Sequence, residues 1–333
     1  MNKLTKIGAS ALCGTLAAVS AANAGALTVK GGATATWTDL SYGVTGNPLG
    51  MATAMTFSGS GELDNGSAIA INIALDDKNT YSASDMSLDI AGIGKFTYDQ
   101  GGGTGIDRFD DKMPTAWEET SGTGVTTGLN TVAGVGGQTD IEWAISSDIL
   151  PDGVSAYLAW SPKADGSKNN DKANSGANAS SVDGMGWDIA VSHTGIADGL
   201  EVFAGYSEIS QGGVGDQTAK VIGATYAVGS FTVGYQHSTA NLDSGGTDYY
   251  ENNAIGISFA VNDDLSISYG KHDSERADAG LSGVELEAES IQLAYTMGGA
   301  SIKVAETSVD NAEYATTTAK DREGTTIALS LAF

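Results

Sequence analysis

The chain has 333 residues, with 41 acidic and 16 basic side chains and a formal net charge of −25. This balance excludes nucleic-acid binding, which needs a basic face, and it favours acidic surfaces that attract cations. The only cysteine, Cys13, lies near the N-terminus, so the chain beyond it can form no disulfide, thiol nucleophile or cysteine metal site.

Residues 1–24 have the parts of an export signal. Lys3 and Lys6 give a positive region, a stretch of small and apolar residues follows, and Ala22-Asn23-Ala24 gives the small-x-small pattern of a cleavage site. A membrane anchor is the alternative, but the apolar stretch is short and interrupted by polar residues. We therefore expect 1–24 to be a cleaved signal peptide. Its removal takes two lysines and leaves a net charge of 14 − 41 = −27.

The segments after residue 25 alternate between apolar residues and small or polar ones. This period of two predicts β-strands with one apolar face and one polar face. The segments are about 9–11 residues long, the length of a tilted strand that crosses a bilayer, and no later apolar run reaches the roughly 18 residues of a transmembrane helix. Clear examples are 69–75, 265–269, 291–297 and 327–333.

The connections between these segments alternate between short and long. The short ones contain Gly, Asn, Asp or Pro, which tight hairpins need, and lie at 64–66, 92–94, 148–153, 195–199, 228–230, 262–264 and 298–299. The long, polar ones lie around 41–50, 76–85, 100–138, 162–185, 210–216, 240–248, 274–284 and 309–321. Seven turns and eight loops join sixteen strands, and an even number is typical of bacterial barrels with periplasmic turns and extracellular loops.

Two arrangements could hold such strands. A soluble sandwich would turn the apolar faces inward, whereas a membrane barrel turns them toward lipid. The continuous small, polar face and the alternation of connections favour the barrel. Unpaired backbone groups are costly in hydrocarbon, so the sheet must close on itself. We predict an all-β fold, with residues 25–333 forming one transmembrane antiparallel up-and-down β-barrel of about sixteen strands.

The segment Gly92-Ile93-Gly94-Lys95-Phe96-Thr97-Tyr98-Asp99-Gln100 resembles the glycine turn and fifth strand of the Gram-negative general (diffusion) porins, and Phe333 resembles their barrel-assembly signal. The chain is most similar to sixteen-stranded alphaproteobacterial porins. The resemblance implies an outer-membrane location, a homotrimer, contacts with lipid and lipopolysaccharide, recognition by the barrel assembly machinery through the C-terminal strand, and a third loop folded into the lumen. The family often places arginine near the Asp99 position, but this chain has only Arg108, Arg276 and Arg322.

The long connection 100–138 is the candidate for that loop, because connections above about 12–15 residues are usually functional or disordered. Phe109, Met113 and Trp117 favour packing against an inner wall; an external loop is the alternative. The candidate charged residues of the constriction are Asp107, Arg108, Asp110, Asp111, Lys112, Glu118 and Glu119.

Strand parity, the alternation of side chains between the two faces of a strand, predicts which residues line the lumen. Residues next to a lipid-facing one in the sequence point inward. The candidates are Lys30, Lys95, Asp99, Glu142, Lys303 and Arg322, and Glu62, Asp89, Asp188 and Glu201 share the inward parity. Since the first and last strands are neighbours, Lys30, Lys303 and Arg322 would form a basic wall facing the loop acids. Glu285, Glu287 and Glu289 have lipid-facing parity, so either the strand has left the membrane there or a bulge resets the register.

Enzymatic signatures are missing from the sequence: the three histidines are far apart and lack metal-ligand spacing. We predict no catalytic residue, cofactor or metal site, although Ca²⁺ bound by Asp107, Asp110 and Asp111 is an alternative. The expected function is a water-filled channel for passive diffusion of ions and small hydrophilic solutes, with a preference for cations. The alternatives are a secreted structural or surface-layer β protein and a substrate-specific outer-membrane channel.

Overall fold

The structure, a computed structural model, describes residues 27–42, 46–77, 80–164, 183–212, 215–242, 249–277 and 283–332. The predicted signal peptide and Phe333 lie outside the described residues. Within these ranges, no helix has the length and apolar character needed to cross a membrane.

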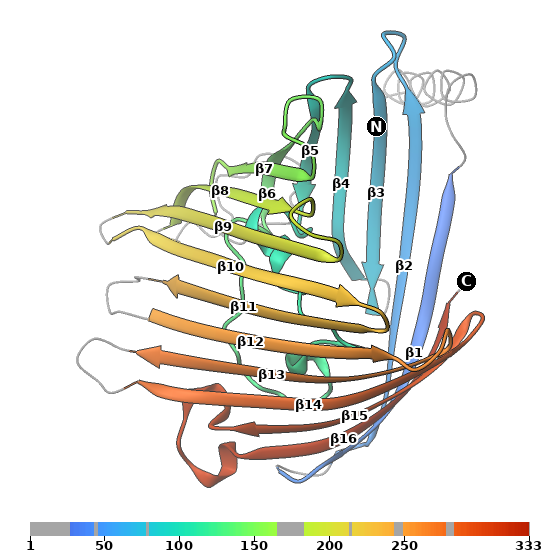
Figure 1. The fold of residues 1–333 in the computed structure, drawn as a ribbon, viewed down its shortest axis with the longest axis vertical. Coiled ribbons are helices and arrows are strands. Elements are labelled where there is room, and N and C mark those ends of the chain that lie inside the picture. The colour runs from blue at the N-terminus through green and yellow to red at the C-terminus, as the bar shows by residue number, and fades with distance from the viewer. Residues whose placement is uncertain are drawn as a thin grey trace, which may run out of the picture.

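The described part of the chain forms sixteen β-strands, each paired in antiparallel with the next, and β16 pairs with β1 to close the sheet (Figure 1). Closure leaves no edge strand with unpaired backbone groups. The predicted sixteen-stranded antiparallel barrel is confirmed. The strands are β1 (Thr28–Leu40), β2 (Leu49–Glu62), β3 (Ala68–Asp76), β4 (Thr80–Ile90), β5 (Gly94–Gln100), β6 (Thr139–Ile145), β7 (Val154–Ser161), β8 (Asp183–His193), β9 (Leu200–Gln211), β10 (Gln217–Val228), β11 (Phe231–Asn241), β12 (Tyr249–Ala260), β13 (Leu265–Ala277), β14 (Val284–Met297), β15 (Ala300–Asp310) and β16 (Arg322–Ala332).

The seam between the first and last strands is a regular ladder. Its pairs run without interruption from Gly32 opposite Ala332 to Leu40 opposite Gly324. In Figure 1, strands β2–β4 run steeply across the direction of β9–β14. Strands that tilt around a barrel cross in this way when two walls are seen in one view.

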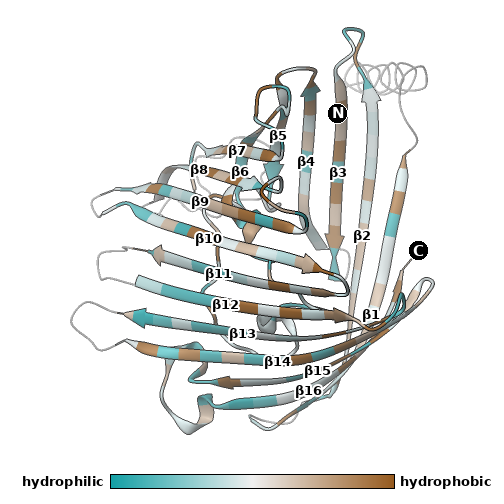
Figure 2. Ribbon diagram, in the orientation of Figure 1, coloured by the Kyte–Doolittle hydropathy of each residue, from teal (hydrophilic) through white to brown (hydrophobic). Residues whose placement is uncertain are grey.

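Large apolar side chains lie on the outside of the barrel. Ile267, Leu293 and Ile327 are 41%, 38% and 41% exposed, whereas their inward-facing neighbours Ser268 and Gln292 are buried. Figure 2 shows the resulting alternation of hydrophobic and hydrophilic residues along the strands. A soluble sandwich would bury the apolar face, so this inverted arrangement contradicts the sandwich and fits a barrel with lipid outside.

The turn before β5 depends on a glycine. Gly94 has a φ of 121°, a backbone conformation that side chains disfavour. A Cβ atom there would also collide with the carbonyl oxygen of Ala144 on β6. The glycine therefore lets β5 start beside β6 and lead directly into the long connection at 101–138.

The three glutamates that break the parity rule lie on the outer face of β14. The ladder between β13 and β14 is continuous from Arg276 opposite Val284 to Leu265 opposite Tyr295, with no register shift. The alternative of a bulge is therefore wrong. Glu285, Glu287 and Glu289 occupy the end of β14 next to the long loop, where Lys271 Nζ lies 2.7 Å from Glu287 Oε2. With the bulge excluded, the remaining prediction is that this end of the strand extends beyond the hydrocarbon.

Candidate pore constriction

The connection between β5 and β6, the constriction loop (100–138), follows the inner wall of the barrel. Its first 3₁₀ turn, η2 (Gly105–Phe109), contacts β7, β8 and β9, and its second, η3 (Thr120–Gly122), contacts β13 and β14. Between them, Pro114 lies so close to β11 and β12 that a Cβ on Gly234 or Gly256 would be 2.6 Å or 2.8 Å from it. The loop thus crosses the lumen from β5 to the opposite wall.

Carboxylates of the wall hold the beginning of the loop. Asp99 accepts a hydrogen bond from the backbone N–H of Gly102 (2.6 Å), Glu142 from Gly105 N–H (2.8 Å) and Asp188 from Ile106 N–H (2.9 Å). Asp140 accepts a hydrogen bond from the Thr104 hydroxyl (2.5 Å). Because the four acceptors hold successive loop residues from Gly102 to Ile106, these side chains together fix the path of the loop where it leaves β5.

The position of the loop against the wall corrects the predicted roles of two wall residues. Asp99 and Glu142 face inward, as their parity requires, but they are only 5% and 6% exposed because the loop covers them. They anchor the loop rather than line open water. Parity specifies the side of the sheet to which a residue points, and it contains no information about what covers that side.

The two basic residues of the loop point at the wall. Arg108 forms an ion pair with Glu142, donates from Nε to the carbonyl of Gly105 (2.8 Å), and its guanidinium lies 3.5 Å from the Tyr157 ring centroid. Lys112 Nζ lies 2.8 Å from Glu201 Oε1. Their charges are therefore compensated locally, whereas Asp111 and Glu118 of the same loop are exposed. The loop presents mainly negative charge to the lumen.

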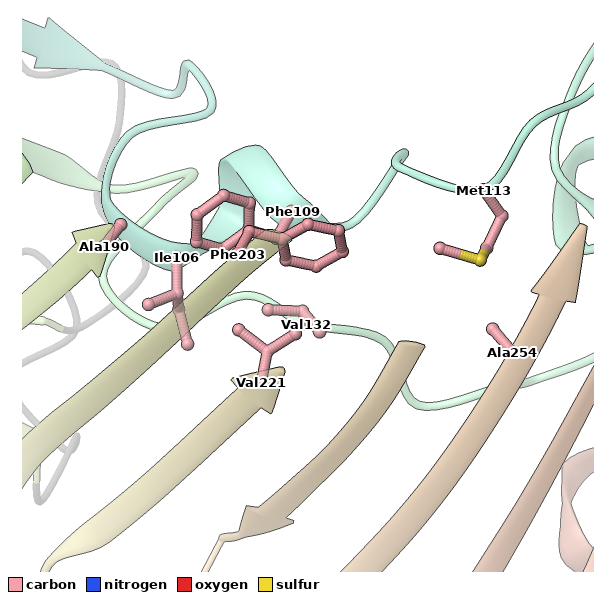
Figure 3. Close-up of a cluster of buried hydrophobic side chains, with 8 residues drawn as sticks. All are labelled: Ile106, Phe109, Met113, Val132, Ala190, Phe203, Val221 and Ala254. Atoms are coloured by element: carbon pink, nitrogen blue, oxygen red, sulfur yellow. The ribbon is translucent and has the colours of Figure 1, made fainter. Parts of the chain in front are cut away.

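Apolar packing adds to these polar anchors. Ile106, Phe109 and Met113 of the loop are buried against inward residues of the wall, and Phe109 stacks on Phe203 of β9 with centroids 4.8 Å apart (Figure 3). Val132, on the returning part of the loop, joins the same cluster. The packing inferred for Phe109 and Met113 is thus present, and Trp117 lies half-buried beside Lys303.

We expect Phe109→Leu to weaken docking of the loop by about 1 kcal/mol, the range of a lost aromatic stack with volume largely kept. The readout is more frequent switching between conductance levels in single-channel records. The matched control is Phe259→Leu on the outer face, which removes the stack with Phe231 (4.5 Å) but touches no loop residue. Equal switching in both variants would contradict the packing role of Phe109.

Burial raises the pKa of three loop acids. The pKa of Asp107 rises to about 7, first by burial and then by repulsion from Asp110 and Asp111. The pKa of Asp110 rises to about 6, first because the side chain is buried and then because Asp111 repels its negative charge. Glu119 reaches a pKa of about 8 by burial, opposed by a hydrogen bond from Met113 N–H. The charge of the constriction therefore changes across neutral pH.

The three residues of the predicted basic wall, Lys30, Lys303 and Arg322, have different surroundings in the structure. Lys303 of β15 lies 5.8 Å from the Trp117 ring, so it touches the loop. Arg322 of β16 is only 8% exposed and donates to Glu313 and to the carbonyl of Thr126. Arg322 is therefore a buried structural residue and not an open lumen charge, and this corrects its predicted role. Lys30 is exposed at the start of β1, on its inward face.

The inner face of β1–β5 carries exposed charges of both signs. They are Lys30, Glu62, Asp89 and Lys95, and Asp89 lies directly opposite Lys95 in the ladder. The loop contacts described above fall on β5–β16. These four charges therefore stay exposed on the part of the inner face that the loop contacts described above do not reach.

Neither a family model nor a curated protein sequence matches the chain. Solved structures do: OmpF of Salmonella typhi in complex with daunomycin has a TM-score of 0.67 at 14% identity, covering 92% of this chain and 97% of that one. The anion-selective porin of Comamonas acidovorans (0.66, 12% identity, 92% and 99% covered) and the trimer form of OmpT from Vibrio cholerae (0.66, 10%, 92% and 99%) are similar too. The chain has the fold of a sixteen-stranded porin.

Sequence reasoning missed several residues that this porin fold brings to the loop. Gln292 of β14 accepts hydrogen bonds from the backbone N–H groups of Trp117 and Glu118, both at 3.1 Å. No pattern in the sequence marks Asp140, and for Asp188 the sequence indicates only an inward direction. The glycines at both ends of the loop were a usable signal: a Cβ on Gly105 or Gly134 would collide with the Asp188 carboxylate.

The calcium alternative finds no support in the geometry. Among the described residues, which include Asp107, Asp110 and Asp111, no group of three or more His, Cys, Asp or Glu side chains is arranged to hold a metal ion. The Asp110 carboxylate instead accepts a hydrogen bond from the backbone N–H of Val132 (3.2 Å).

Proposed function

We propose that the mature chain, 25–333, forms a water-filled channel in a Gram-negative outer membrane and passes ions and small hydrophilic solutes by passive diffusion. The supporting observation is the combination of an apolar outer face with a polar lumen narrowed by a charged, well-anchored loop. Pores of this kind select by width and by the charges that line them. No similar structure named above is described as an enzyme, and we propose no catalytic activity.

Reconstitution into a planar bilayer tests this function. We expect stepwise conductance increments that are ohmic in salt and not blocked by any one solute at low concentration. Saturable block by one sugar or peptide would indicate the substrate-specific alternative. Solubility without detergent, a lack of heat-modifiable mobility on gels and a lack of conductance would indicate a secreted structural protein instead.

We also propose a preference for cations. The exposed acids Asp111 and Glu118 on the loop and Glu62 and Asp89 on the wall support it, against Lys30 and Lys95. Neutralising the loop acids in Asp111→Asn/Glu118→Gln should lower the cation-to-anion permeability ratio by at least about fivefold, since each unit charge about 4 Å from an ion contributes roughly 1 kcal/mol in bulk water. Reversal potentials under a salt gradient measure the ratio. An anion-selective wild type would remove this proposal.

We propose further that three copies associate in the membrane, that lipid and lipopolysaccharide cover the apolar outer face, and that Phe333 is the assembly signal. The trimer form described for Vibrio cholerae OmpT, a protein with the same fold, supports the first point. The outward residues of β1–β4, such as Val29, Met51, Ile71 and Met86, are exposed and apolar, which suits contact with lipid or with another barrel. Crosslinking in native membranes tests the trimer.

A further inference from the structure

We propose that the β15–β16 loop (311–321) is a second element of the constriction, and that Glu313 and Tyr314 are positioning residues for the distal segment (126–130) of the constriction loop. The inference rests on the proposed channel function. The wall carboxylates hold the loop near its beginning, at 102–106, and Asp188 also lies 3.2 Å from Val135 N near its end. The distal segment lies on the other side of the lumen and needs its own support.

Backbone hydrogen bonds connect the two loops directly. The N–H of Glu313 donates to the carbonyl of Thr127 (2.8 Å), and the N–H of Asn130 donates to the hydroxyl of Tyr314 (2.8 Å). Arg322, which begins β16, donates from Nη1 to the carbonyl of Thr126 (2.5 Å). Three of the five residues in the distal segment are therefore held by the last hairpin of the barrel.

The Glu313 carboxylate organises the charges behind these bonds. It pairs with Arg322 at 2.7 Å and with Lys320. Hydrogen bonds from Lys320 and Arg322 lower the pKa of Glu313 to about 2. The carboxylate therefore stays ionised, and Arg322 stays aimed at Thr126. The Arg322 guanidinium also lies 4.9 Å from the ring of Tyr42, whose hydroxyl accepts from Thr126 N–H (3.1 Å).

The contacts of the β15–β16 loop with the distal segment form a brace. Tyr314 connects this brace to the barrel wall. Its ring packs edge-on against Tyr250 of β12, with centroids 5.3 Å apart, and its hydroxyl lies 2.7 Å from the Ser274 hydroxyl of β13. Tyr314 and Leu129 also border a buried apolar cluster formed by Val125, Leu286, Ala288, Val309 and Ala312. A single side chain thus ties the distal segment to two wall strands.

The backbone of the β15–β16 loop shows the strain expected of a functional contact. Asn311, Glu313 and Tyr314 have φ values of 54°, 58° and 56°. Left-handed conformations at residues other than glycine persist only where the surroundings enforce them, and they concentrate at functional sites. On the other loop, Gly128 has a φ of 73°, and a Cβ there would lie 2.8 Å from Glu313 Cγ. Each loop is shaped to the other.

The first test measures access to the distal segment. The chain's native cysteine, Cys13, lies in the predicted signal peptide, so Leu129→Cys gives the mature barrel one thiol, whose reaction rate with a hydrophilic maleimide reports release of the segment. Adding Glu313→Gln or Tyr314→Phe should raise this rate by up to about tenfold, because each variant weakens hydrogen bonds that hold the segment. The increase should be larger for Glu313→Gln, because hydrogen bonds to a charged group contribute more. The matched control is Glu323→Gln, an exposed acid on the outer face of β16.

The second test records single channels of Glu313→Gln, Tyr314→Phe and Glu323→Gln. We expect more open-channel noise and more substates in the first two, with wild-type mobility of the folded barrel on unheated gels. Tyr314→Phe removes only one hydroxyl, so it still tests whether the β15–β16 loop holds the distal segment if Glu313→Gln does not fold. Thiol rates equal to wild type in a folded Tyr314→Phe barrel overturn the brace. A silent wild type with accelerated thiol reaction overturns the channel function and leaves the brace standing.

Discussion

In Asp188→Ala, we expect the beginning and end of the constriction loop to detach together while the barrel stays closed. The Asp188 carboxylate accepts from Ile106 N–H (2.9 Å) and lies 3.2 Å from Val135 N, so it clips the outgoing and returning parts of the loop to β8. Alanine leaves two buried N–H groups without an acceptor, at a cost of about 1–3 kcal/mol each, or about 2–6 kcal/mol of docking free energy together.

The measurements are single-channel conductance and the temperature at which the folded trimer or monomer loses its gel mobility. Detachment should raise the mean conductance and its fluctuations, because the loop narrows the lumen, and should lower the melting temperature less, because the β-ladders are unchanged. Asp89→Ala is the control: Asp89 also faces inward but is exposed and lies opposite Lys95, away from the loop contacts. Conductance unchanged in Asp188→Ala but changed in Asp89→Ala would refute the anchoring role.

The second large effect is a rise of cation preference with pH. Asp110, Asp107 and Glu119 have pKa values raised to about 6, 7 and 8, so they are largely protonated at pH 5 and largely ionised at pH 9. One added charge near the path contributes roughly 1 kcal/mol. We expect the cation-to-anion permeability ratio to increase by at least about fivefold over this range.

The same groups make docking of the loop weaker at high pH. Their pKa values are higher in the folded protein than their ordinary values near 4, so the folded state binds more protons between pH 4 and 8, and stability falls as pH rises through that window. Reversal potentials at pH 5, 7 and 9 measure the selectivity. Asp107→Asn/Glu119→Gln should flatten the profile, and a flat profile in the wild type would refute the titration of the constriction.

The two sets of anchors suggest how the lumen keeps a defined width. The carboxylates at Asp99, Glu142 and Asp188 hold the near side of the loop, and the β15–β16 loop holds its far side. Between them, Phe109 and Met113 pack on the wall. A loop held at three places has few ways to move, which suits a channel with a constant conductance.

The sequence alone determined the architecture. Period-two alternation along segments such as 291–297 assigned each side chain to lipid or lumen, and the positions of the turns determined the number of strands. Both properties are local: a residue's side of the sheet follows from its parity, and a hairpin follows from its own few residues. For this reason Ile291 and Leu293, and also Lys95 and Asp99, point to their predicted sides.

Only the tertiary structure decided which inward residues meet water. Asp99, Glu142 and Arg322 have the same inward parity as Lys95, yet the loops bury the first three and leave the last exposed. Ile106 meets Asp188 across 82 residues of sequence, and Thr126 meets Arg322 across 196. Such contacts depend on where a closed barrel brings distant segments together, and the path of a long loop across that lumen leaves no periodic mark in the chain.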